Sequence, residues 1–144
     1  KIGSSKKYGA IKFPECCYPV HGDPCLAVHN ELGITIHREN CENLKGFLNT
    51  PGRCSNINWE KNDDSEYLAA LTMTLVNEPG ALADVSKIIS SNESNIQSVL
   101  TKTLDENFIE LTVKILVRDI EHLNTINSKL MKNKTVTNIA RKLT

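Results

Sequence analysis

Four side chains with the chemistry of metal ligands stand in two pairs. Cys16 and Cys17 are adjacent, and His37 and Cys41 follow as a second pair with four-residue spacing. Thiolate and imidazole together are the donors that tetrahedral Zn²⁺ prefers. Neighbouring side chains point apart on an extended strand, so Cys16 and Cys17 can share one ion only if the chain turns there. We predict a structural zinc site made by these four residues.

Two other interpretations of the same residues stay open. The cysteines could be small buried hydrophobes in a metal-free core. They could also form a redox pair, although a disulfide between neighbours requires a strained peptide. A catalytic zinc site would need an open coordination position and a general acid or base. The nearby acidic residues stand in no hydrolase-type motif: Glu15, Glu39 and Glu42.

The distribution of cysteine and histidine divides the chain. All five cysteines and three of the four histidines fall within the first 60 of 144 residues. We interpret Cys25 and Cys54 as core residues, with a substitute-ligand role for Cys25 as the alternative, and His21 and His29 as surface residues. An odd cysteine count without a signal sequence argues against a secreted disulfide framework. We therefore expect a reducing, cytoplasmic compartment.

Composition excludes several classes of protein. A hydrophobic content of 40% is typical of a globular chain. No apolar run approaches the ~18 residues of a membrane span. With 17 basic and 17 acidic side chains, the net charge of zero speaks against a bulk electrostatic nucleic-acid binder. The chain begins at Lys1 rather than Met, so we expect it to be cut from a longer one.

A polar, mostly charged stretch over residues 60–66 marks the predicted boundary between two domains. We place a Cys/His domain at 8–60 and a second domain at 66–144. Within the first we expect short strands at 26–28 and 34–36, a short helix over 40–48 and a last strand containing Ile57 and Trp59. A domain with so few large apolar side chains would fold only marginally without a metal.

The second domain has clear hydrophobic periodicity. Apolar residues alternate over 71–75 and 109–117, which predicts half-buried strands, and 96–104 is a third strand. Helical spacing starts at Leu82 and, after a predicted Asp119 cap, at Ile120. A last strand is expected over 135–143. The order strand, helix, strand, strand, helix, strand predicts an α+β domain with one antiparallel sheet and two helices on one face.

These motifs resemble a known family. Residues 16–23, Cys-Cys-Tyr-Pro-Val-His-Gly-Asp, followed by 33–41, Gly-Ile-Thr-Ile-His-Arg-Glu-Asn-Cys, resemble the zinc-finger-like domain of RelA/SpoT homologues. Trp59 is similar to the tryptophan of that family's short Val-x-Trp strand. Residues 77–85, Asn-Glu-Pro-Gly-Ala-Leu-Ala-Asp-Val, resemble the turn-and-helix motif of an ACT domain, which follows in the same family. The resemblance covers about residues 8 to 144.

The resemblance implies a βαββαβ ACT fold and two further kinds of contact. An amino acid could bind at the ACT turn, through Asn77, Glu78, Gly80, Ala81 and Leu82, although the Pro79-Gly80 pair could also be only a tight turn. ACT domains pair through sheet edges or helices, so a homodimer is one expected assembly. Family members touch ribosomal RNA, for which Arg38, Lys45 and Arg53 are the candidate contacts here.

The function that the resemblance implies is regulatory. Full-length relatives are GTP pyrophosphokinases and (p)ppGpp hydrolases of the bacterial stringent response, and their C-terminal regions read ribosome and tRNA state. The sequence has no phosphate-binding Gly-rich loop and no carboxylate cluster suited to Mg²⁺, so we expect no catalysis by this chain itself. Upstream catalytic domains are the implied partners. The alternatives are an ACT effector domain of an amino-acid biosynthetic enzyme and a stand-alone zinc-dependent RNA-binding module.

Overall fold

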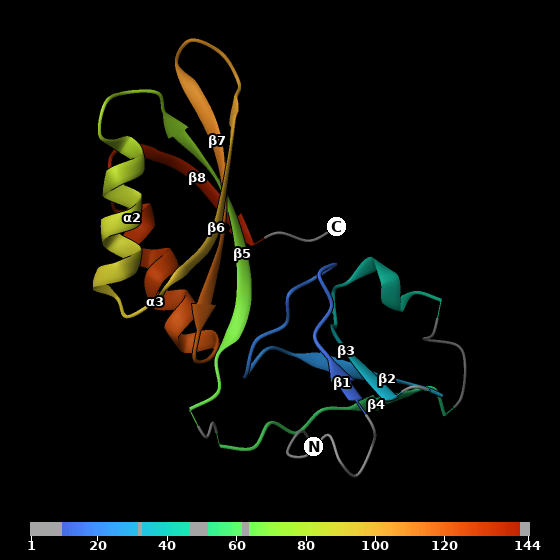
Figure 1. Ribbon diagram of the computed structural model, residues 1–144. Coiled ribbons are helices and arrows are strands. Elements are labelled where there is room, and N and C mark those ends of the chain that lie inside the picture. Colours follow the sequence, from blue (N-terminus) through green and yellow to red (C-terminus); the bar gives the residue numbers. More distant parts are fainter. Residues whose placement is uncertain (1–9, 32, 47–51, 62–63, 142–144) are drawn as a thin grey trace.

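The computed structural model describes residues 10–31, 33–46, 52–61 and 64–141. Its strands form two four-stranded sheets, and Figure 1 shows the smaller sheet lying beside the larger one. We call residues 10–61 the N-terminal part and residues 64–141 the C-terminal part. The N-terminal part is a small sheet with loops, whereas the C-terminal part has helices and a long sheet, which confirms the α+β class.

The N-terminal part is built on a sheet with the strand order β1-β3-β2-β4. The short β1 (Ala10–Lys12) runs parallel to β3 (Gly33–Arg38), and β2 (Cys25–Asn30) pairs antiparallel with β3 and with β4 (Cys54–Asn56). The strands expected at 26–28 and 34–36 are confirmed as the centres of β2 and β3. The strand β1 was not predicted, because it has only three residues.

Two predictions for the N-terminal part are wrong in detail. The helix expected over 40–48 is a single 3₁₀ turn, η1 (Glu42–Leu44), and positions 47 and 48 lie outside the described residues. No side chain caps this turn at Cys41, and Gly46 is a poor helix former. The last strand is β4, not the segment with Ile57 and Trp59, whose side chains pack against the small core instead.

The C-terminal part has the predicted order of strands and helices. The elements are β5 (Tyr67–Val76), α2 (Ala81–Ser91), β6 (Ile96–Thr103), β7 (Phe108–Val117), α3 (Ile120–Met131) and β8 (Val136–Arg141). The strands form an antiparallel sheet in the order β6-β7-β5-β8, and both helices cover one of its faces (Figure 1). No helix among the described residues has the length and apolar character needed to cross a membrane.

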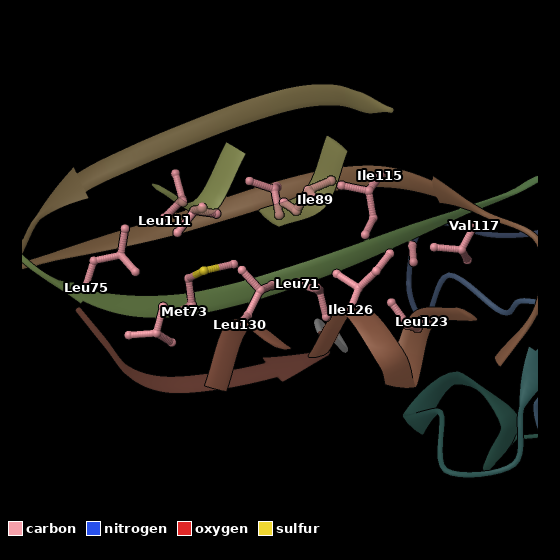
Figure 2. Packing of buried hydrophobic residues seen from close by; sticks show 14 of the residues in the cluster. Leu71, Met73, Leu75, Ile89, Leu111, Ile115, Val117, Leu123, Ile126 and Leu130 are labelled. Atoms are coloured by element: carbon pink, nitrogen blue, oxygen red, sulfur yellow. The ribbon is translucent and has the colours of Figure 1, made fainter. Parts of the chain in front are cut away.

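One continuous core holds the C-terminal part together. Alternate residues of β5 and β7 point to the helices, so Leu71, Met73 and Leu75 face the buried stripe of α3 in Figure 2. Helix α3 begins where expected, because the Asp119 carboxylate accepts a hydrogen bond from the His122 amide at 2.8 Å. The same core also includes Val20, which comes from the N-terminal part.

Candidate metal centre

The adjacent cysteines lie in a turn, which is the condition for both thiols to reach one point. Residues 15–17 form the turn, and the Tyr18 amide closes it on the Pro14 carbonyl at 3.0 Å. Tyr18 itself has a φ of 46°, in the left-handed region that few residues other than glycine adopt. As a result the two Sγ atoms lie 3.9 Å apart on the same side of the chain.

Strand β3 and the turn after it deliver the other two candidate ligands. His37 is the second-last residue of β3, and Cys41 follows a turn closed by its amide on the Arg38 carbonyl at 2.9 Å. The His37 Nδ1 atom lies 3.4 Å from Cys16 Sγ and 3.9 Å from Cys17 Sγ. Cys41 Sγ lies 3.5 Å from Cys16 Sγ. All four ligand atoms are within 4.8 Å of one another, so this Cys₃His cluster could hold a metal ion.

Burial sets the electrostatics of the cluster. Cys17, His37 and Cys41 are buried, and desolvation raises the pKa of the Cys17 and Cys41 thiols while it lowers the pKa of His37. The Arg38 amide lies 3.4 Å from Cys17 Sγ and favours its thiolate. The imidazole is therefore kept neutral, as a ligand must be. The thiols stay protonated unless a cation is present to stabilise the thiolates.

The remaining cysteines and histidines lie away from the cluster. Cys25 is buried in the small core with Ala27 and Ile36, and burial, followed by the charge of Asp23, raises its pKa to about 12. Cys54 is half-buried on β4. His29 bonds Ser55 Oγ at 2.7 Å, and His21 bonds the Glu60 carbonyl.

The three basic residues singled out for RNA have different surroundings. Arg38 is half-buried, and its Nη1 donates to the Cys17 carbonyl at 3.2 Å. Burial lowers the pKa of Arg38, as does the nearby Arg141, while Asp23 opposes the shift. Lys45 and Arg53 are exposed, and Arg53 Nε donates to the His29 carbonyl at 2.9 Å. Lys45 and Arg53 are thus more exposed than Arg38.

The turn singled out as an amino-acid site joins β5 to α2. Gly80 has a φ of 87° and stands just before α2, where no side-chain hydrogen bond caps the helix. Ala81 is buried in the core, while Leu82 is 40% exposed. Asn77 donates its amide to the Asn107 carbonyl at 2.7 Å, and Glu78 is exposed. The turn is therefore fixed to the neighbouring hairpin.

Sequence reasoning gave no role to residues that join the two parts. Arg141, on β8, forms an ion pair with Asp23 in the loop after the Cys pair, with an Nη1–Oδ1 distance of 2.7 Å. Gly22 and Asp23 belong to the motif that carries the family resemblance, which was a signal of importance. The contact of Asp23 with Arg141 could not be found from the sequence, because 118 positions separate the two residues.

Comparison with known families gives two matches in the same order as the two sheets. Residues 3–60 match the RelA/SpoT RIS domain, and residues 63–141 match the ACT domain. The chain therefore belongs to the ACT domain family. With the RIS domain in front of the ACT domain, it is the RIS-plus-ACT regulatory region of the RelA/SpoT family of (p)ppGpp synthetases and hydrolases.

Several individual proteins are similar to this chain. The chain is 32% identical over 132 residues to the bifunctional (p)ppGpp synthase/hydrolase SpoT of Escherichia coli K12, covering 91% of this chain and 19% of that protein. It is 26% identical over 117 residues to the GTP pyrophosphokinase of Streptomyces coelicolor, covering 81% of this chain and 14% of that protein. The crystal structure of the ACT domain from the GTP pyrophosphokinase of Chlorobium tepidum has 21% identity, covers 54% of this chain and 99% of that one, and gives a TM-score of 0.48. The chain thus spans about a fifth of the length of the Escherichia coli relative.

Proposed function

We propose that this chain is a zinc-stabilised regulatory region that controls (p)ppGpp synthesis and hydrolysis by catalytic domains elsewhere in its parent protein. The observation that supports the proposal is the buried Cys₃His cluster, placed in the part that matches the RIS domain and followed directly by the ACT fold. In this proposal the parent is a cytoplasmic GTP pyrophosphokinase and (p)ppGpp hydrolase of the stringent response. We also propose that the Cys/His domain extends over 8–60 and the ACT domain over 66–144.

The geometry of the cluster supports zinc as the bound ion. A tetrahedral ion with bonds of about 2.3 Å to sulfur and 2.0–2.1 Å to nitrogen separates two sulfurs by ~3.8 Å and a sulfur from a nitrogen by ~3.6 Å. The cluster has sulfur–sulfur distances of 3.9 and 3.5 Å and sulfur–nitrogen distances of 3.4 and 3.9 Å. Four protein donors leave no open coordination position, so the site fits a structural role.

The charges and protonation states of the four ligands suit such a site. Cys16, Cys17 and Cys41 would each bind as a thiolate, and the Arg38 amide already points at Cys17 Sγ. His37 would bind through Nδ1, which its neutral state leaves available. Bound zinc would cross-link the turn at 15–17 to the end of β3. Its role would be structural rather than catalytic.

The regulatory role can be tested in the full-length parent protein. We expect Cys17→Ser to leave basal (p)ppGpp synthesis and hydrolysis intact and to abolish their response to ribosomes carrying uncharged tRNA. Cys54→Ser is the matched control, since Cys54 lies outside the cluster. An unaltered ribosome response in Cys17→Ser would contradict the proposal.

Contact with ribosomal RNA or tRNA is a second element of the proposed function. Exposed Lys45 and Arg53 can reach phosphate or 2′-hydroxyl groups, whereas half-buried Arg38 donates a hydrogen bond to the Cys17 carbonyl. Lys45→Glu in the full-length protein should weaken ribosome association, and more so at low salt than at high salt. Lys87→Glu on α2 is the control. Equal association of the Lys45 variant and the parent across a salt titration would remove this contact.

Amino-acid sensing at the ACT turn is proposed through residues 77–82. The free N–H groups and dipole of a helix start favour a carboxylate, and no side-chain hydrogen bond caps α2 at Gly80. Titration calorimetry of the 144-residue chain with each amino acid should show binding that Gly80→Pro removes. Absence of heat with every amino acid at millimolar concentration would mean that the turn has only a structural role.

A homodimer is proposed through the outer edge of the large sheet. Strand β6 is one of the two edge strands of this sheet, and its Val99 and Leu100 are 44% and 69% exposed. Unpaired edge strands are ready to pair with a second copy. Light scattering should show a dimer that Leu100→Lys converts to monomer, and a parent chain that stays monomeric at high concentration would contradict it.

A further inference from the structure

The loop that follows the Cys pair is inserted into the C-terminal part. Val20 is fully buried and belongs to the core formed by β5, β7, α2 and α3. The next residue, His21, accepts a hydrogen bond through its carbonyl from the Ile120 amide at 2.7 Å, at the start of α3. Gly22 has a φ of 96°, and a Cβ there would lie 2.7 Å from Ile120 Cγ2. The loop therefore fits closely against α3.

A buried ion pair fixes the same loop to the last strand. The two terminal guanidinium nitrogens of Arg141, Nη1 and Nη2, donate to the Asp23 carboxylate at 2.7 and 2.9 Å, and Nη2 also donates to the Tyr18 carbonyl at 2.8 Å. The Asp23 and Arg141 side chains are only 3% and 16% exposed. Asp23 also holds the loop internally, because its Oδ2 accepts from the Val20 amide at 2.8 Å. Docking of the C-terminal part against the loop over residues 18–23 thus requires one particular conformation of that loop.

The candidate metal centre holds the other end of this loop. Cys17 immediately precedes Tyr18, so a cross-link at Cys17 restrains the backbone that presents the Tyr18 carbonyl to Arg141. Arg38 contacts Cys17 twice, through its amide to Sγ and through Nη1 to the carbonyl. The left-handed conformation of Tyr18 is costly in a free chain and needs support from both sides. Metal ligation and docking of the C-terminal part therefore require the same backbone conformation.

We infer that filling the Cys₃His cluster and docking the ACT domain against the loop over residues 18–23 are thermodynamically coupled. The bound ion holds the loop in its docking conformation, and loss of the ion releases the ACT domain from the RIS domain. This inference rests on the metal site of the proposed function. Coupling is reciprocal, so weakening the docking contact must also weaken metal binding. The pair of domains would then pass the state of the metal site to the rest of the parent protein.

The first test measures zinc affinity in a docking variant. Zinc is titrated into the reduced 144-residue chain in competition with a chromophoric chelator. Arg141→Ala removes the ion pair with Asp23 and touches no candidate ligand, and we expect its dissociation constant for zinc to rise at least about fivefold. Arg118→Ala, which removes the exposed ion pair with Glu93, is the control and should stay within about twofold of the parent. An Arg141→Ala affinity equal to that of the parent would overturn the inference.

The second test uses the unmodified chain and so does not depend on a variant that folds. Amide hydrogen exchange is followed by NMR in zinc-loaded and zinc-free samples. The Ile120 amide, which bonds His21 across the interface, should lose protection on zinc removal. The Leu116 amide, which bonds Asn95 within the C-terminal part at 3.0 Å, should keep it. Equal protection of Ile120 in both samples would overturn the inference.

These tests separate failure of the coupling from failure of the metal site. If the unmodified 144-residue chain takes up no zinc, both the metal centre of the proposed function and the coupling are excluded. A parent chain that binds zinc normally, with Arg141→Ala and Ile120 both unaffected, would leave the metal centre in place and remove the coupling alone.

Discussion

The two parts of this chain hold their folds by different means. In the C-terminal part, sheet and helices enclose a continuous core in which Leu71, Ile115 and Ile126 are fully buried. In the N-terminal part, the buried members of the small-sheet core are, among the residues that the structure describes, Cys25, Ala27 and Ile36. Small apolar cores of this kind rarely stabilise a fold alone. The difference supports the proposal that packing holds the ACT domain, whereas the RIS domain depends on a metal bound by its ligand cluster.

The largest expected effect separates the two parts directly. His37→Ala removes one ligand, and bound structural zinc contributes on the order of 10 kcal/mol to small domains. We expect the amides of β2 and β3 to lose protection from hydrogen exchange, while those of β5 and β7 keep it. His29→Ala, which changes a histidine outside the cluster on the same sheet, is the control. Full protection of β2 and β3 in His37→Ala would mean that packing holds both parts.

A core truncation should show the opposite pattern. Leu71→Ala, in the centre of β5, should lower the free energy of unfolding of the ACT domain by about 2–5 kcal/mol, because it leaves a cavity in a closed core. Urea denaturation gives the free energy, and elemental analysis should show the same metal content as the parent. A large loss of metal with little change in the ACT domain would contradict the division.

The junction between the parts should give an intermediate effect. Gly22→Ala places a Cβ 2.7 Å from Ile120 Cγ2 at a position with positive φ, so we expect a destabilisation of about 1–3 kcal/mol. Gly46→Ala is the matched control, since a Cβ there meets no atom within 4 Å. Urea denaturation of the metal-loaded chain compares the two. Equal stability of both variants would show that the loop does not fit as closely as described.

The smallest expected effect concerns a helix start within the ACT domain. Asp119→Ala removes the carboxylate that accepts from the His122 amide, which should lower the free energy of unfolding by about 1 kcal/mol. Thermal unfolding followed by circular dichroism at the helix signal measures this change. Asn124→Ala, at an exposed position of the same helix, should change it by less than about 0.5 kcal/mol. Equal losses in the two variants would exclude the cap as the cause.

The same contrast explains what could be predicted from sequence. In the ACT domain, long alternating strands and amphipathic helices identify the elements, and the Asp119 cap is confirmed. In the RIS domain, β1 and β4 have three residues each, too few to show periodicity, and their pairing is decided by distant partners. Within the segment 40–48, the described residues form a single 3₁₀ turn, and Cys41 at its N-cap makes no side-chain capping hydrogen bond.

The candidate site was predicted better than the elements that position it. Cys16, Cys17, His37 and Cys41 meet as the sequence suggested, through the turn that an adjacent Cys pair requires. The contact between Asp23 and Arg141 was not predictable, since it depends on how the two domains lie together. Zinc binding by the Cys₃His cluster, the role of the ACT turn, and RNA contact through Arg38, Lys45 and Arg53 remain predictions.

Metal content tests most directly whether a bound metal stabilises the fold of the RIS domain. Elemental mass spectrometry of the purified chain, with thiol titration before and after a chelator, gives both the ion and its ligands. We predict one zinc per chain and release of three thiols, those of Cys16, Cys17 and Cys41, on chelation. Chains without metal that keep a folded N-terminal part would contradict the account.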